Sequence, residues 1–121
     1  MSELDERPLE DLTIESVDWT HRAEHIRTRS ERYGRSELDV EPEWATEAAL
    51  EPNRLIDRAS ERSIVVIGLS LSAPPRHPQD EGRLLKVWLV PKDLDLGDWW
   101  GASACEANAS DRRQYWEKTH E

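Results

Sequence analysis

The sequence has no phenylalanine, only one cysteine and no long apolar run, and these absences exclude several classes of protein. Because Cys105 is alone, a scaffold held by internal disulfides is excluded. The longest apolar runs, 64–71 and 84–90, have strand length and fall short of the roughly 20 residues of a membrane-spanning helix. The first residues also lack the basic and apolar regions of a secretory signal. We therefore expect a cytoplasmic protein without membrane contact.

Positive charge is scarce as well, since 26 acidic residues against 16 lysines and arginines give a formal net charge of −10. The charge is unevenly placed: residues 1–18 hold seven acids against one arginine, residues 19–36 hold five arginines against two glutamates, and residues 37–61 hold eight acids against two arginines. Phosphate binding requires a positive field. This distribution argues against nucleic-acid binding by the whole surface and leaves room for a local basic site.

Hydrophobic periodicity predicts an α+β protein. A short half-buried strand is expected at 13–19, followed by helices at 20–30 and 41–51. The remaining elements are strands at 54–58, 62–71, 83–90 and 98–104 and a helix at 106–119. Short connections between the last four strands predict a small twisted antiparallel sheet of about four strands, with two N-terminal helices and one C-terminal helix. Residues 1–13 are polar and acidic, which predicts a flexible arm before a single domain at 14–121.

The C-terminal half carries motifs that resemble a known family. They are Gly82-Arg83-Leu84-Leu85-Lys86-Val87, then Ser103-Ala104 and Ala107, then Asp111-Arg112-Arg113-Gln114-Tyr115. Together they resemble the BrnT toxins, which have the RelE-like fold of bacterial toxin–antitoxin ribonucleases. The likeness extends loosely over residues 21–117, and its specific part is 82–115.

That resemblance implies the toxin of a type II toxin–antitoxin system, a metal-independent endoribonuclease that inhibits translation. The implied partners are RNA and a cognate antitoxin with a ribbon-helix-helix DNA-binding part, and no cofactor is implied. The expected catalytic residues are His25, Lys92, Arg112 and Arg113. The expected RNA-binding residues are Arg29, Arg32, Arg83, Trp100 and Tyr115. His25 enters because histidine is suited to proton transfer near neutral pH, and no family residue assigns it that role.

Three departures from the family pattern weaken this expectation. The arginines of the family fall on Lys92, Trp100 and Cys105 in this chain. Metal-free RNA cleavage needs cations that neutralise the phosphorane, and neither tryptophan nor cysteine can replace the planar fork of arginine. The activity is therefore expected to be weakened. The alternative is a catalytically inactive RelE-like fold that acts as a protein-binding module, which the net charge favours.

Structural interpretations of the same residues stay open. The face formed by His21, His25, Arg29 and Arg32 is also explained as a solvated helix surface, and it lacks the third ligand of a metal site. On the last helix Tyr115 and Trp116 cannot both point inward, and Trp116 is expected to pack while Tyr115 lies near the edge. A nuclease requires Arg83, Lys92, Arg112 and the histidine face in one cleft. Their dispersal argues against it.

Overall fold

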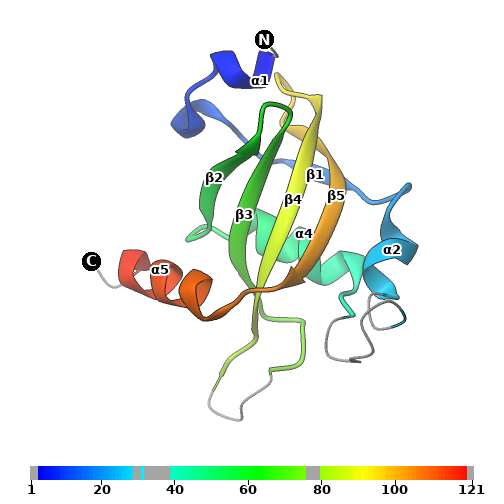
Figure 1. Cartoon of the computed structure of the whole chain (residues 1–121), viewed down its shortest axis with the longest axis vertical. Coiled ribbons are helices and arrows are strands. Elements are labelled where there is room, and N and C mark those ends of the chain that lie inside the picture. The colour runs from blue at the N-terminus through cyan, green and yellow to red at the C-terminus, as the bar shows by residue number, and fades with distance from the viewer. Residues whose placement is uncertain (1–2, 29–30, 32–38, 76–79, 120–121) are drawn as a thin grey trace.

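The computed structural model describes residues 3–28, 31, 39–75 and 80–119, and it contains one five-stranded sheet with helices before and after it (Figure 1). The chain begins with two short helices, α1 (Glu3–Glu6) and η1 (Leu9–Asp11). The elements that follow are β1 (Ser16–Asp18), α2 (Ala23–Arg27), α4 (Pro42–Leu50), β2 (Leu55–Ser60), β3 (Ser63–Ser70), β4 (Arg83–Asp93), β5 (Asp98–Glu106) and α5 (Ala109–Thr119). No helix in these ranges is both long and apolar enough to cross a membrane.

The sheet is mixed, which corrects the expected antiparallel sheet of about four strands. Its order is β1-β5-β4-β3-β2, and β2 to β5 form the predicted antiparallel series. β1 adds a fifth strand at the edge and runs parallel to β5, with Ser16 beside Asp98 and Asp18 beside Trp100. The parallel direction is possible because helices and three strands separate β1 from β5, whereas a hairpin would force an antiparallel pair.

Most predicted elements are present with shifted ends. β4 continues through Pro91 to Asp93, so the connection between the strands predicted at 83–90 and 98–104 is shorter, and it ends on Gly97 with a φ of 71°. The last helix begins at Ala109 and not at 106, because Asn108 and Asp111 exchange hydrogen bonds between side chain and backbone at its start. The predicted helix at 20–30 is described only as α2, and its end at 29–30 lies outside the described residues.

One face of the sheet packs against α4, which lies behind the strands in Figure 1. Alanines on α4 allow close approach, and Gly68 on β3 is required there, since a Cβ at this position would lie 1.9 Å from the Ala48 carbonyl oxygen. Trp99 is fully buried and its Nε1 donates to the carbonyl of Thr13 at 2.8 Å. The main core on this side includes Ile64, Val66, Leu85, Val87, Leu89 and Ala104.

The N-terminal segment, predicted as a flexible arm, contributes to that core over its described residues. Leu4 is 1% exposed and Leu12 is also buried. Arg58 on β2 donates hydrogen bonds to the backbone carbonyls of Leu4, at 3.1 Å, and of Arg7. Apolar burial and backbone contacts therefore hold α1 against the end of the sheet, although the composition of this segment is acidic.

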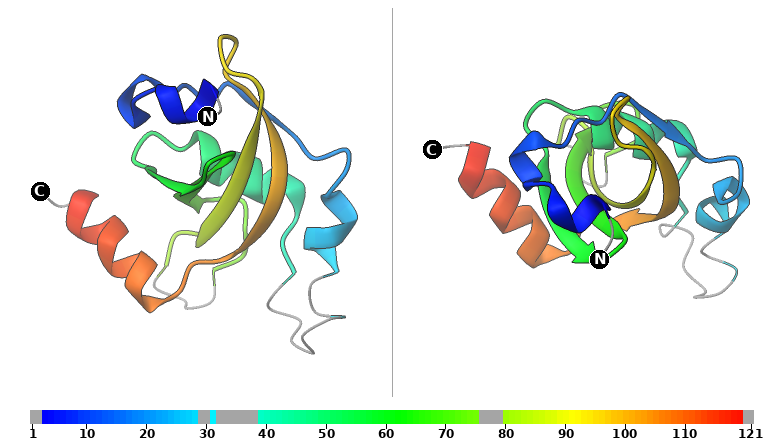
Figure 2. Two further views of the ribbon diagram at one scale, coloured as in Figure 1. Left: turned by 45° about the horizontal axis from the view of Figure 1, so that its top comes forward. Right: turned by 90° about the horizontal axis from the view of Figure 1, so that it is seen from above.

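Among the described residues, a helix covers the opposite face of the sheet at one end only. There α5, orange to red in Figure 2, lies beside the sheet. Its Tyr115 packs against Ile67 and Leu84, together with Ala107. Tyr115 is 2% exposed and Trp116 is 40% exposed, so the expected orientation of this pair was wrong. Tyr115 takes the inward position because its ring packs against Ile67 and Leu84 and its hydroxyl bonds to Glu51. We call the remaining part of this face, which α5 does not cover, the uncovered sheet face.

Candidate functional site

The predicted site residues lie in two groups toward opposite ends of the sheet. Arg83 begins β4, near α5, whereas Lys92 lies at the other end of the same strand. At about 3.3 Å per residue, nine residues of strand separate their backbones by roughly 30 Å. Arg112 and Tyr115 belong with Arg83, and Trp100 belongs with Lys92. The residues needed for one cleft are thus divided between two places.

The first group is the edge cluster, formed by Asp18, His21, Lys92 and Trp100. The ammonium of Lys92 lies 3.0 Å from the Asp18 carboxylate and 4.4 Å from the centre of the Trp100 ring. The imidazole of His21 lies 5.1 Å from that ring, tilted by 46°. β1 places Asp18 beside Trp100, so three strands and the segment before α2 meet here. Of this cluster, the sequence had singled out Lys92, Trp100 and His21 but not Asp18.

Asp18 sets the electrostatics of the edge cluster. The hydroxyl and the backbone N–H of Thr20 both donate to its carboxylate, and Lys92 pairs with it; together these contacts hold the pKa of Asp18 well below its usual range. Asp18 therefore stays anionic near neutral pH and, because its proton affinity is low, is a weak general base there. Its charge also offsets that of Lys92, which is the only cation of the family pattern at this place.

The second group lies under and along α5, and its members are engaged in the fold. Arg83 is 8% exposed, and its Nε lies 3.6 Å from the Glu106 carboxylate. Arg112 lies 3.9 Å from the carboxylate of Asp80. The hydroxyl of Tyr115 donates to Glu51 at 2.9 Å, and its burial together with this bond raises the pKa of Tyr115 above its ordinary value. Arg113 is exposed on the same helix.

The histidine–arginine face is described only in part. His25 is half-buried on α2, and it is His21, one turn earlier, that contacts the Trp100 ring. Arg29 and Arg32 lie outside the described residues. Within the described ranges, no three histidine, cysteine, aspartate or glutamate side chains come together as a group able to hold a metal ion.

The uncovered sheet face carries a hollow that the sequence analysis missed. It has a volume of about 510 Å³ and is lined by Ser60, Arg62, Ser63, Trp88, Val90, Ala102 and Ser103. Trp88 forms one wall, with the Lys86 ammonium 5.6 Å from its ring centre. The alternation of Lys86, Trp88 and Val90 along β4 was the available signal, because residues two apart on a strand share a face. We call this space the Trp88 hollow.

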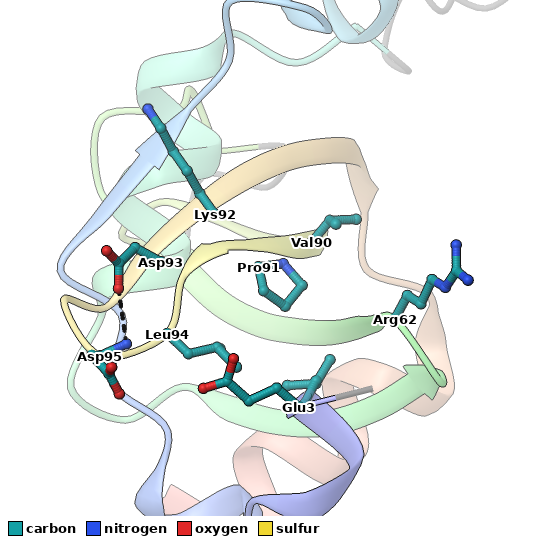
Figure 3. A pocket seen from close by; sticks show the side chains of 9 residues that line it. Glu3, Arg62, Val90, Pro91, Lys92, Asp93, Leu94 and Asp95 are labelled. Carbon is teal, nitrogen blue, oxygen red and sulfur yellow. Dashed lines mark hydrogen bonds between the residues drawn. The ribbon is translucent and has the colours of Figure 1, made fainter. Parts of the chain in front are cut away.

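A second hollow of about 450 Å³ adjoins the first (Figure 3). Arg62 and Val90 line both hollows, so the two hollows adjoin each other on the surface. Arg62 lines this hollow from the β2–β3 turn, and Glu3 lines it from α1 on the other side (Figure 3). The N-terminal segment therefore borders this end of the uncovered sheet face.

Comparison with known proteins gives this chain no relative: no family model, no curated protein and no solved structure matches it. The resemblance to BrnT toxins consequently rests on the motifs of the sequence alone. The α+β fold with its mixed, mostly antiparallel sheet stands independently of that resemblance.

Proposed function

We propose that this protein is a catalytically inactive RelE/BrnT-like fold that acts as a protein-binding module. The observation that carries the proposal is the separation of the two groups. Cleavage of RNA without a metal needs its cations and its proton-transfer group around a single phosphate. Arg83 and Arg112 lie with α5, whereas Lys92 lies in the edge cluster.

The engagement of the cations supports the same proposal. Arg83, Arg112 and Lys92 each lie within 4.0 Å of a carboxylate of the chain itself. A phosphate would have to compete with these carboxylates, and the net charge of −10 opposes a polyanion over longer distances. A protein partner does not have to bring a chain of phosphates to these cations.

The uncovered sheet face is the surface that fits this role. Trp88 and Trp100 are half-buried on strands β4 and β5, and α5 covers only the other end of this face. Tryptophans on a protein surface are frequent anchors of protein–protein interfaces. The resemblance implies an antitoxin-type protein as the partner, and this identity belongs to the proposal.

One observation favours a second candidate, a weakened endoribonuclease. The edge cluster combines an aromatic ring on which a base could stack, an ammonium near it and a histidine. Histidine is suited to proton transfer near neutral pH. On this reading cleavage would depend on His21, Lys92 and Trp100 and not on the residues of α5.

Tightly induced expression, followed by growth and bulk RNA integrity, separates the two functions. The proposal expects no growth arrest and intact RNA for the wild type. It expects the same for a His21→Ala/Lys92→Ala variant and for the control Lys118→Ala, an exposed lysine on α5. Circular dichroism establishes that each protein is folded. Growth arrest with RNA cleavage in the wild type and the control, but not in the double variant, would replace the proposal by the second candidate.

The binding role itself has a positive test. A partner cross-linked to the wild type in cells should be lost with Trp88→Ala and Trp100→Ala and retained with Lys118→Ala, which lies outside the uncovered face. Retention in all variants would show that the partner uses another surface, and the proposed role of the uncovered sheet face would then be wrong.

A further inference from the structure

The Trp88 hollow combines an apolar interior with a polar rim. Trp88, Val90 and Ala102 supply apolar surface, while the rim carries three serine hydroxyls and one guanidinium, from Ser60, Ser63, Ser103 and Arg62. Its volume of about 510 Å³ falls within the range of roughly 300–1,000 Å³ that is typical of ligand pockets. The hollow is therefore large enough for a side chain together with the backbone that carries it.

An irregularity in the sheet creates this shape. Trp88 pairs with Ser103 and Leu89 pairs with Gly101, so Ala102 is an extra residue in β5. Such a bulge changes the direction of neighbouring side chains. Here it places two small residues, Ala102 and Ser103, beside the large ring of Trp88, and the difference in size leaves the space open.

Arg62 differs from the other cations near this face. The ammonium groups of Lys86 and Lys92 lie 3.3 Å and 3.0 Å from the carboxylates of Asp111 and Asp18. Arg62 is exposed at the turn between β2 and β3, and among the described residues no carboxylate lies within 4.0 Å of its guanidinium. Within the hollow, Arg62 thus offers the positive charge that is still available to a ligand.

We infer that the Trp88 hollow binds a partner segment that presents an apolar side chain next to a carboxylate. The apolar side chain lies against Trp88 and Val90, and the carboxylate pairs with Arg62, whose planar fork suits two carboxylate oxygens. The hydroxyls of Ser60 and Ser63 are hydrogen-bonded to each other at 2.7 Å, which uses one of their two hydrogens and leaves the other free to donate to the same carboxylate. This inference rests on the proposed function and adds the chemistry of the partner.

A single carboxylate fits the hollow better than a nucleic acid does. Each nucleotide adds a phosphate, and successive phosphates would require several unpaired cations. The hollow offers one such cation, and the chain as a whole carries a net charge of −10. The carboxylate can come from a C-terminus or from an aspartate or glutamate side chain, and separate probes distinguish these sources.

The test follows amide and indole signals of the full chain by nuclear magnetic resonance during titration with four probes. They are acetyl-Ala-Ala-Leu with a free C-terminus, the same peptide with a C-terminal amide, acetyl-Ala-Leu-Asp-Ala-amide, and adenosine 5′-monophosphate. At least one carboxylate-bearing peptide should shift the signals of Trp88, Val90 and Ser103 and bind about tenfold more tightly than the neutral amide. Which of the two binds identifies the source of the carboxylate.

Two variants locate the interaction. Arg62→Gln should reduce the affinity for the carboxylate-bearing peptide about tenfold and leave the weak binding of the neutral amide unchanged. Ala102→Leu fills the hollow and should abolish the binding of both peptides. Lys118→Gln, an equal loss of charge on exposed α5, is the matched control and should bind like the wild type. The spectrum of each free variant reports whether it is folded.

Three results would overturn the inference: no peptide shifts the Trp88 signals, Arg62→Gln binds the carboxylate-bearing peptide as the wild type does, or only adenosine 5′-monophosphate binds. None of these results depends on the expression experiment. Growth arrest with RNA cleavage would contradict the proposed function while the peptide titration still reports on the hollow. The two failures are therefore distinguishable.

Discussion

At the scale of single residues, the fold distinguishes neighbours of similar chemistry. Trp99 is fully buried in the main core, while Trp100 faces the other side of the sheet with Lys92 over its ring. Tyr115 is buried with its hydroxyl bonded to Glu51, whereas Trp116 is partly exposed. Tyr115 belongs to the motif that resembles the BrnT helix. In this structure its role is to join α5 to the end of α4.

A prediction about Tyr115 follows from its burial. Tyr115→Phe keeps the packing and removes the hydrogen bond to Glu51, so the free energy of unfolding at pH 7 should fall by about 1–2 kcal/mol. Urea unfolding measures this change. Trp116→Phe is the control and should alter stability by less than about 0.5 kcal/mol, since Trp116 is 40% exposed. Equal effects of both changes would contradict the assignment of Tyr115 to the core.

The same residue predicts a dependence on alkaline pH. Burial and the bond to Glu51 raise the pKa of Tyr115, so the folded state holds the phenol neutral where an unfolded tyrosine ionises, near pH 10. The stabilisation from the neutral phenol is fully present below pH 10 and is lost as pH rises above it. Unfolding curves between pH 8 and 11 should show a steeper loss of stability for the wild type than for Tyr115→Phe. Parallel losses would exclude Tyr115 as the cause.

At the scale of elements, α1 and β1 are attached to the rest of the fold by different kinds of contact. α1 is attached through the buried side chain of Leu4 and through Arg58, which donates to two backbone carbonyls. β1 is a strand of three residues at the sheet edge. Polar contacts support it, among them Ser16 Oγ donating to Asp98 at 2.7 Å and the ion pair of Asp18 with Lys92.

The attachment of α1 can be tested by truncating one side chain. Leu4→Ala should lower the free energy of unfolding by about 2–4 kcal/mol, because Leu4 is 1% exposed and its removal leaves a cavity. Leu96→Ala is the matched control, since Leu96 is 63% exposed, and it should change stability by less than about 0.5 kcal/mol. Thermal or urea unfolding provides both values. If Leu4→Ala left the free energy of unfolding unchanged, the N-terminal segment would be the flexible arm that its composition predicted.

The attachment of β1 should depend on acid pH through Asp18. The fold lowers the pKa of this carboxylate, so its contribution is present above the pKa of about 3.9 of an unfolded aspartate and is lost as pH falls below it. The protection factors of the β1 amides, which correct hydrogen exchange for its intrinsic dependence on pH, should therefore fall below pH 4 in the wild type. Asp18→Asn should show lower protection factors at pH 6 and little further change on acidification. Glu10→Gln, exposed on η1, is the control and should match the wild type.

At the scale of the whole molecule, both the net charge and the topology oppose the binding of RNA. Ten more acidic than basic side chains produce a field that repels polyanions, and Arg83, Lys92 and Arg112 are paired with carboxylates of the chain itself. At 150 mM salt, the dissociation constant for a fluorescent single-stranded RNA should exceed roughly 10⁻⁴ M, the weak end of non-specific nucleic-acid binding. Fluorescence anisotropy measures it. Saturable binding in the micromolar range would support the ribonuclease candidate instead.

The sequence by itself determined most of the elements, because periodicity is a local property. The alternation over 13–19 and the aliphatic runs at 62–71 and 83–90 predicted strands that the fold contains. Pro42 and the acids beside it marked the beginning of α4. These signals operate over a few residues of chain, where backbone geometry alone decides which side chains share a face.

Only the tertiary structure decided how these elements meet. The parallel pairing of β1 with β5 brings Asp18 beside Trp100 across more than 80 residues of sequence, and the bulge at Ala102 opens the Trp88 hollow. The same topology separates Arg83 from Lys92 at the two ends of one strand. Motif spacing along the chain does not contain these distances, because they depend on strand register and on packing between segments remote in sequence.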